Sequence, residues 1–178
     1  MLTLGVIAGV YFGIAATAFW SVTVPVVPFV ATTVLGGMLI VLSLAERLAL
    51  RLPDLLPLVL AGCGLLATLV MAPDALVSRI LGAIIGLAAM QMMAVAWRRA
   101  IGVGGPQLAD VWLFGAGGAW IGVEGLSTTL LWASAGLVLS ALIALASGYR
   151  IERTVRIPLG PWLGLGVWLV WLFKALVE

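Results

Sequence analysis

Long apolar runs recur along this sequence, and several approach or exceed the roughly 18 residues that a membrane-spanning helix needs. Charged residues make up only 9% of the 178 residues, whereas a soluble domain carries about 25%. So few charges could not cover a surface that faces water. A β-barrel would instead show short segments of alternating hydrophobicity. The sequence therefore predicts an all-α, polytopic membrane protein, with residues 1–178 forming one domain.

The apolar runs predict a bundle of about seven transmembrane helices, with six to eight allowed. The fifth run is short, and the turn between the fifth and the sixth is tight. The expected spans are 3–20, 27–45, 55–72, 80–97, 111–125, 128–147 and 161–177.

The basic residues predict the orientation of these spans. Most of them fall between spans two and three, four and five, or six and seven, and these are Arg47, Arg51, Arg98, Arg99, Arg150, Arg153 and Arg156. Loops rich in Lys and Arg remain in the cytoplasm. Arg79 and Lys174 depart from the pattern. We therefore expect a cytoplasmic N-terminus and an outside C-terminus.

Composition excludes several kinds of function. The net charge of +2 is too small to indicate binding of nucleic acid. The absence of histidine excludes a histidine-based triad and a typical zinc site. The single cysteine, Cys63, lies in an apolar run and offers neither a disulfide nor a metal cluster. Any chemistry must therefore come from carboxylates, hydroxyls, lysine or the backbone, and we expect no metal and no cofactor.

Three acidic residues lie at predicted cytoplasmic ends of apolar spans: Glu46, Asp54 and Asp110. Ionisable groups at membrane depth are costly, which makes them candidates for function. Each also has a structural alternative. Asp54, which follows Pro53, is well placed to cap span three, and Asp110 could cap span five in the same way. Glu46 could form a surface ion pair with Arg47.

Glycines in the fifth span predict close helix packing. Gly115, Gly118 and Gly122 fall at helical spacing, and the last two form a G-x-x-x-G motif. Small residues on one face allow helices to approach closely in lipid. We therefore expect span five, which begins beside Asp110, to lie inside the bundle. Glu124 at its other end is expected at the outer interface.

Three segments resemble the type IV prepilin peptidase (leader peptidase) family. DVWLFGAGGAWIG (110–122) resembles the family's D-V-K-L-L-A-A-L-G-A-W-L-G segment. AERLALRLPDLL (45–56) looks like its I-D-x-x-x-x-x-L-P-D-x-L segment. RIPLGPWLGLGVWL (156–169) is similar to its P-I-P-F-G-P-F-L-A-L-A-G-W-L. The segments follow the family's order and span most of the chain from residue 45 onward.

The resemblance implies an aspartic-type endopeptidase of type IV pilus or secretion systems. Such enzymes are multi-pass proteins of the bacterial inner membrane, and they cut leaders from prepilin or pseudopilin precursors at its cytoplasmic face. The family's two catalytic aspartates fall on Glu46 and Asp110. One carboxyl group would keep its proton and polarise the scissile carbonyl, while the other would take a proton from the attacking water. The resemblance leaves open which residue plays which part.

Two departures from the family pattern bear on activity. The chain has QLAD (107–110) where the family has G-x-G-D, and Glu46 is one methylene longer than aspartate. Without CxxC pairs, the chain resembles the short form that lacks the cysteine-rich methyltransferase region. A catalytically inactive homologue that binds pilin-like helices is therefore an alternative. A small transporter is another, because intramembrane acids and a helix broken at IPLGP would suit one.

Overall fold

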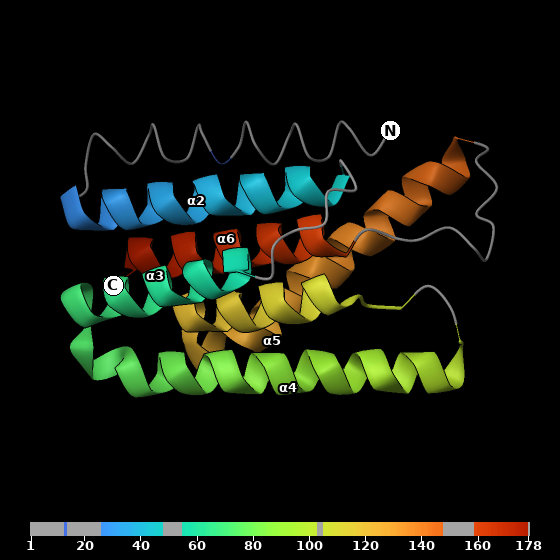
Figure 1. Cartoon of the computed structure of the whole chain (residues 1–178). Coiled ribbons are helices and arrows are strands. Elements are labelled where there is room, and N and C mark those ends of the chain that lie inside the picture. The colour runs from blue at the N-terminus through green and yellow to red at the C-terminus, as the bar shows by residue number, and fades with distance from the viewer. Residues whose placement is uncertain (1–12, 14–25, 48–54, 103–104, 148–158, 178) are drawn as a thin grey trace.

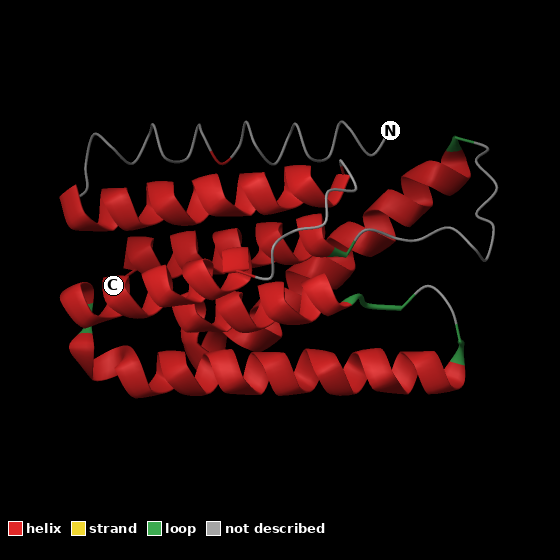
Figure 2. Cartoon of the chain, viewed as in Figure 1, coloured by secondary structure: helices red, strands yellow, loops and turns green. Residues whose placement is uncertain are grey.

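A computed structural model describes residues 13, 26–47, 55–102, 105–147 and 159–177, and they form an all-helical bundle (Figures 1 and 2). A short 3₁₀ helix, η1 (Pro73–Ala75), precedes α4, and the described part contains no strand. The predicted all-α class is confirmed. The α-helices of the described part are α2 (Val26–Arg47), α3 (Leu55–Met71), α4 (Leu76–Ala100), α5 (Leu108–Ala146) and α6 (Gly160–Val177).

Four predicted spans match helices to within a few residues: 27–45, 55–72, 80–97 and 161–177 correspond to α2, α3, α4 and α6. The first predicted span, 3–20, lies outside the described residues except for Gly13. The structure does not confirm the count of seven. By length and composition, the segments Pro73–Ala100 and Leu108–Ile143 could each cross a membrane, whereas Pro28–Leu42 and Leu55–Met71 are shorter apolar helices.

The boundary predicted between spans five and six, at 125–128, is wrong. Both spans belong to α5, which is interrupted at Gly122 by a non-helical backbone with φ 75° and ψ 179°. A positive φ is easily adopted only by glycine, which has no Cβ atom to clash with the backbone. Gly122 therefore divides α5 into a first arm (108–121) and a second arm (123–146).

The two arms of α5 run in opposite directions along α6 (Figure 1). Along the first arm, residues further toward the C-terminus of α5 contact residues further toward the C-terminus of α6. Along the second arm, they contact residues further toward the N-terminus of α6. The pairs that show this are Gly117–Val167 and Ile121–Lys174 for the first arm, and Gly125–Val170 and Gly136–Trp162 for the second. The two arms of α5 thus form a helical hairpin.

Glycines bring α4 and the first arm of α5 into backbone contact. A Cβ atom on Gly118 would lie 2.5 Å from the carbonyl carbon of Gly82, and one on Gly82 would lie 2.6 Å from the carbonyl oxygen of Gly118. Gly115 also faces α4, and a Cβ atom on Gly82 would lie 2.8 Å from the carbonyl carbon of Gly122, so the predicted packing face is confirmed. Gly122 has a further role, because it forms the break. Gly82 and Gly86 repeat the same spacing on α4.

Two buried tryptophans connect four helices at the centre of the bundle. Trp120 of α5 and Trp171 of α6 meet edge to face, with ring centroids 5.2 Å apart. The Trp120 Nε1–H donates to the Leu60 carbonyl of α3 at 2.8 Å, and the Trp171 Nε1–H donates to Thr32 Oγ1 of α2 at 2.9 Å. Gly64 leaves room for the Trp120 ring, which a Cβ atom there would approach to 2.7 Å. These contacts hold the first arm inside the bundle, as predicted.

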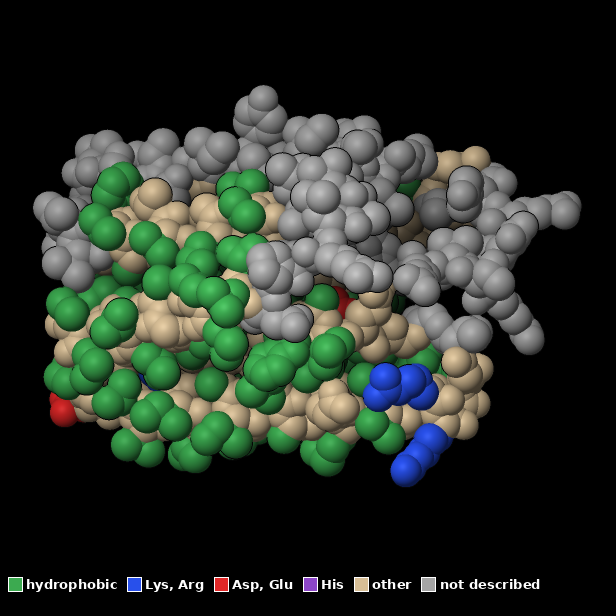
Figure 3. All heavy atoms as spheres, viewed as in Figure 1, with side chains coloured by type: hydrophobic (Ala, Val, Ile, Leu, Met, Phe, Trp, Pro, Cys, Tyr) green, Lys and Arg blue, Asp and Glu red, His purple; other side chains and the backbone are tan. Residues whose placement is uncertain are grey.

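The outer surface is largely apolar. In Figure 3 hydrophobic side chains cover much of the described face in view. Leu66, Val70, Val77 and Met92 are each more than 60% exposed. An apolar exterior is what a lipid-facing bundle requires, since soluble proteins rarely expose large contiguous apolar patches.

Most of the described helix ends that adjoin arginine-bearing stretches of the sequence lie at one end of the bundle. The C-termini of α2, α4 and α5 and the N-termini of α5 and α6 all lie at this end (Figure 1). Arg98 and Arg99 occupy the last turn of α4 there. The opposite end carries η1, with Asp74, and the break at Gly122. These helix ends adjoin the arginine-bearing stretches of the sequence, and the placement of those stretches in the cytoplasm stays a prediction.

Candidate functional site

Asp110 lies in the first turn of α5, at the arginine-bearing end of the bundle. Its side chain is 4% exposed, and its Oδ2 accepts a hydrogen bond from the Gln107 backbone N–H at 2.8 Å. This bond is the acidic half of a capping box, and a carboxylate at this position also suits the positive end of the helix dipole. The N-cap residue of α5 is thus Gln107, and Asp110 takes part in capping as the N3 acid of the box and not as the N-cap that the sequence suggested.

The segment before Asp110 adopts a conformation that requires no glycine. Gln107, the N-cap residue, has φ −90° and ψ 168°, which is ordinary extended backbone. The left-handed glycine is found earlier, at the end of α4, where Gly102 has φ 87° and donates its N–H to the Trp97 carbonyl. The two glycines of the family motif are therefore replaced here by a regular capped helix start.

Glu46 belongs to the last turn of α2, which lies at the same end of the bundle as the first turn of α5 (Figure 1). Its side chain, like the whole of Asp54, lies outside the described residues. Among the described helices, α2 packs against α3 and α6, and both of these also pack against α5. The meeting of Glu46 with Asp110 and the cap proposed for Asp54 stay predictions.

An open groove of about 450 Å³ lies between α4 and the start of α5. It reaches the turn that carries Asp110, but the buried carboxylate is not part of its wall, because Asp110 sits about 200° around the helix from Leu108. The lining is apolar except for one amide: Ile84, Leu87, Ala88, Gln91, Leu108, Val111 and Trp112.

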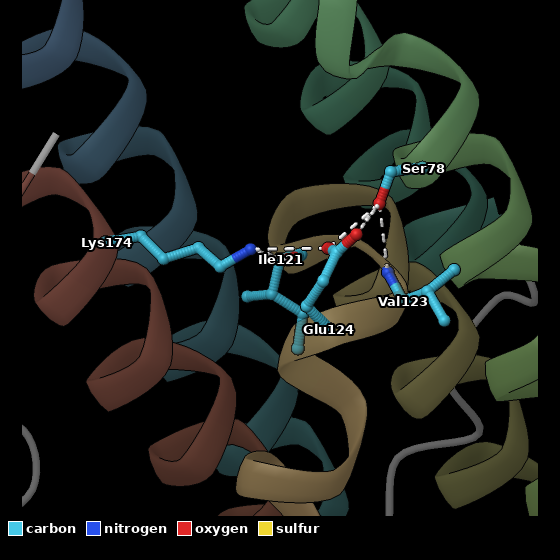
Figure 4. Close-up of polar contacts among 5 residues, drawn as sticks. All are labelled: Ser78, Ile121, Val123, Glu124 and Lys174. Carbon is cyan, nitrogen blue, oxygen red and sulfur yellow. Dashed lines mark hydrogen bonds and ion pairs between the residues drawn. The ribbon is translucent and has the colours of Figure 1, made fainter.

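A second polar cluster, not expected from the sequence, surrounds the break in α5 (Figure 4). Ser78 Oγ donates to the Glu124 carboxylate, with 2.9 Å to either oxygen, and accepts from the Val123 N–H at 3.3 Å. Lys174 Nζ donates to the Ile121 carbonyl at 2.9 Å and lies 3.5 Å from a Glu124 oxygen. One side chain from α4 and one from α6 therefore hold both sides of the break.

This cluster satisfies the backbone where the helix is interrupted. The end of one helix leaves carbonyl groups without intrahelical partners, and the start of the next leaves N–H groups. Lys174 donates a hydrogen bond to the carbonyl of Ile121, and the Ser78 hydroxyl accepts one from the N–H of Val123. Glu124, expected at an interface, is 65% exposed in its side chain and stands at the start of the second arm. The sequence did not indicate that Ser78 holds the break, because it is a single serine within an apolar run.

Arg79, the other basic residue that departs from the charge pattern, is 8% exposed. Its guanidinium carbon lies 5.8 Å from the centroid of the Trp171 ring, within the range of a cation–π interaction. Arg79 and Lys174 are both held by contacts inside the bundle. Their positions therefore reflect packing and not the sidedness of the chain.

Among curated proteins, the chain is similar to a prepilin leader peptidase/N-methyltransferase of Pectobacterium carotovorum subsp. carotovorum, with 33% identity over 135 residues. The match covers 75% of this chain and 47% of the relative, so the chain spans about half the length of the curated relative it matches. No family model and no solved structure matches the chain. Together with the long apolar helices of the bundle, this similarity supports a membrane protein.

Proposed function

We propose that this chain is a membrane aspartyl endopeptidase of the prepilin peptidase family. It cleaves the leader of prepilin or pseudopilin precursors at the cytoplasmic face of the bacterial inner membrane. The similarity to a prepilin leader peptidase/N-methyltransferase carries the proposal. It is supported by the position of Asp110, a buried acid in the first turn of the apolar helix α5.

Asp110 and Glu46 are the proposed catalytic pair. The hydrogen bond from Gln107 holds Asp110 Oδ2, while Oδ1 accepts no hydrogen bond from the described residues. In the proposed arrangement Oδ1 faces Glu46, and the two carboxyl groups share one proton, because two adjacent carboxylates do not both ionise easily. The ionised group activates a water, and the protonated group polarises the scissile carbonyl.

A catalytically inactive homologue that binds pilin-like helices is the second candidate. The observation in its favour is that Asp110 already has a structural task, capping α5, in a segment without the family's two glycines. A helix cap alone would account for an acid at this position. A transport role has less support, because Asp110 lies in the first turn of α5 and not near the middle of a span.

Co-expression with a prepilin separates these candidates. A peptidase shortens the precursor, which a denaturing gel resolves, and the shortening requires Asp110. The matched control is Asp74→Asn, which neutralises an acid at the opposite end of the bundle and should leave cleavage unchanged. If the precursor keeps its full length but co-purifies with the chain, the inactive homologue is the better description. If it is neither cut nor bound, both candidates fail for that precursor.

A further inference from the structure

Gln91 places an amide on an exposed face of a helix of membrane-spanning length. It lies in α4, within the apolar segment Pro73–Ala100, and two turns before Arg98, which is about 10 Å along a helix axis. Its side chain is exposed and makes no hydrogen bond with any described residue. The amide therefore lies at the depth of the lipid chains with its donors and acceptor unpaired inside the described part.

The surroundings of Gln91 are otherwise apolar, because it is the one amide in the wall of the α4–α5 groove. A lipid chain filling this groove could not hydrogen-bond to it, and an unsatisfied polar group in hydrocarbon is costly. In membranes, glutamine side chains commonly hydrogen-bond across a helix–helix contact. The groove thus suits an occupant that offers both a donor and an acceptor at one particular depth.

We propose that this groove is the contact surface between two copies of the chain, with their Gln91 amides paired across a two-fold axis. Two copies in one bilayer share the same orientation, so the axis runs along the membrane normal. Gln91 of each copy is then at the same depth. A carboxamide has both donor and acceptor atoms, so two of them can exchange two hydrogen bonds, as a self-complementary interface requires.

The residues next to Gln91 fit a close helix contact. Ala88, one turn earlier in the groove wall, is small and exposed, which allows another backbone to approach. Met92 is 67% exposed, and its flexible side chain can fill an irregular gap. A pilin-like helix could occupy the same groove only if it carried a polar group at the matching depth. The second copy supplies that group from its own sequence.

Cysteine cross-linking of the full chain in native membranes tests the contact. In a Cys63→Ser background, Ala88→Cys should give a covalent dimer with a short bis-maleimide, because it lies in the groove while Gln91 is kept. Met93→Cys is the matched control on the same helix. It is exposed but lies about 200° around the helix from Gln91, so it should give little dimer.

Changing the amide tests its role. Gln91→Leu, added to Ala88→Cys, should weaken self-association roughly 3- to 30-fold, measured as the dimer fraction when the protein is diluted into lipid vesicles. Gln91→Asn keeps a carboxamide and should weaken it less. The proposal is overturned if Ala88→Cys links no better than Met93→Cys, if it links to a co-expressed pilin instead, or if Gln91→Leu leaves the dimer unchanged. None of these readouts depends on peptidase activity.

Discussion

At the scale of single residues, Asp110 combines a structural role with a proposed catalytic one. Its carboxylate caps α5 through the Gln107 N–H, and it is buried at the end of the bundle to which Glu46 also belongs. The two roles require different properties of the side chain. A cap needs an oxygen that accepts a hydrogen bond, whereas the proposed catalysis needs a carboxyl group that can hold or release a proton.

Asp110→Asn should separate these roles, because asparagine keeps an acceptor oxygen but cannot act as an acid or a base. We expect no leader cleavage and a melting temperature close to that of the wild type. Asp110→Ala also removes the acceptor of the Gln107 N–H and should cost about 0.5–1.5 kcal/mol of stability. Cleavage assays and thermal melting in detergent measure the two effects. Retained cleavage by Asp110→Asn would remove this residue from the mechanism.

Glu46 can be tested in the same assay with two variants. Glu46→Gln should abolish cleavage without unfolding the chain. Glu46→Asp shortens the side chain by one methylene, and a displacement of about 1 Å in a catalytic group can cost on the order of a hundredfold in rate. We therefore expect a loss of that size in the rate of precursor shortening. Normal cleavage by Glu46→Gln would contradict the proposed pair.

At the scale of helices, close packing of α4 on the first arm depends on glycines that face each other. Gly118→Leu should prevent folding or strongly lower the yield, because its Cβ atom would meet the backbone of Gly82, which can move only if the helices separate. The control is Gly62→Leu in α3, where a Cβ atom would meet nothing within 4 Å. Folded yield is measured by size-exclusion chromatography. Equal yields for both variants would contradict the packing argument.

The break in α5 yields a second prediction at this scale. Lys174→Met removes the side-chain donor to the Ile121 carbonyl and should destabilise the bundle by about 1–3 kcal/mol. Ser134→Ala is the control, because its hydroxyl bonds only to the Leu131 carbonyl of its own helix. Thermal unfolding of both variants is compared with the wild type. If the two lose the same stability, Lys174 is not needed to hold the break.

At the scale of the whole molecule, the C-termini of α2, α4 and α5 share one end of the bundle, and the remaining question is which side of the membrane this end faces. The positive-inside rule predicts the cytoplasm. Reporter fusions after residues 50, 102 and 152 should report a cytoplasmic position, and a fusion after residue 178 should report the outside. An outside signal at any of the first three positions would overturn the orientation.

The sequence by itself determined the helical class, the approximate limits of α2, α3, α4 and α6, and the burial of the first arm. These features follow from the length of apolar runs and from small residues at helical spacing, which are local properties. It also singled out Asp110, because an acid at the border of an apolar run is conspicuous. A capping role could also be proposed for Asp110 from the sequence, because a cap involves only neighbouring residues.

Only the tertiary structure decided where α5 reverses and what holds the reversal. Several glycines in and around the fifth span could have adopted a positive φ, and the sequence does not rank them. Gly122 is the break where Ser78 of α4 and Lys174 of α6 reach the interrupted backbone, and both are remote in sequence. The sequence also did not predict the contacts at the centre of the bundle, because Trp120 and Trp171 donate hydrogen bonds to residues of α3 and α2. Such pairings depend on how distant helices pack, which local patterns do not encode.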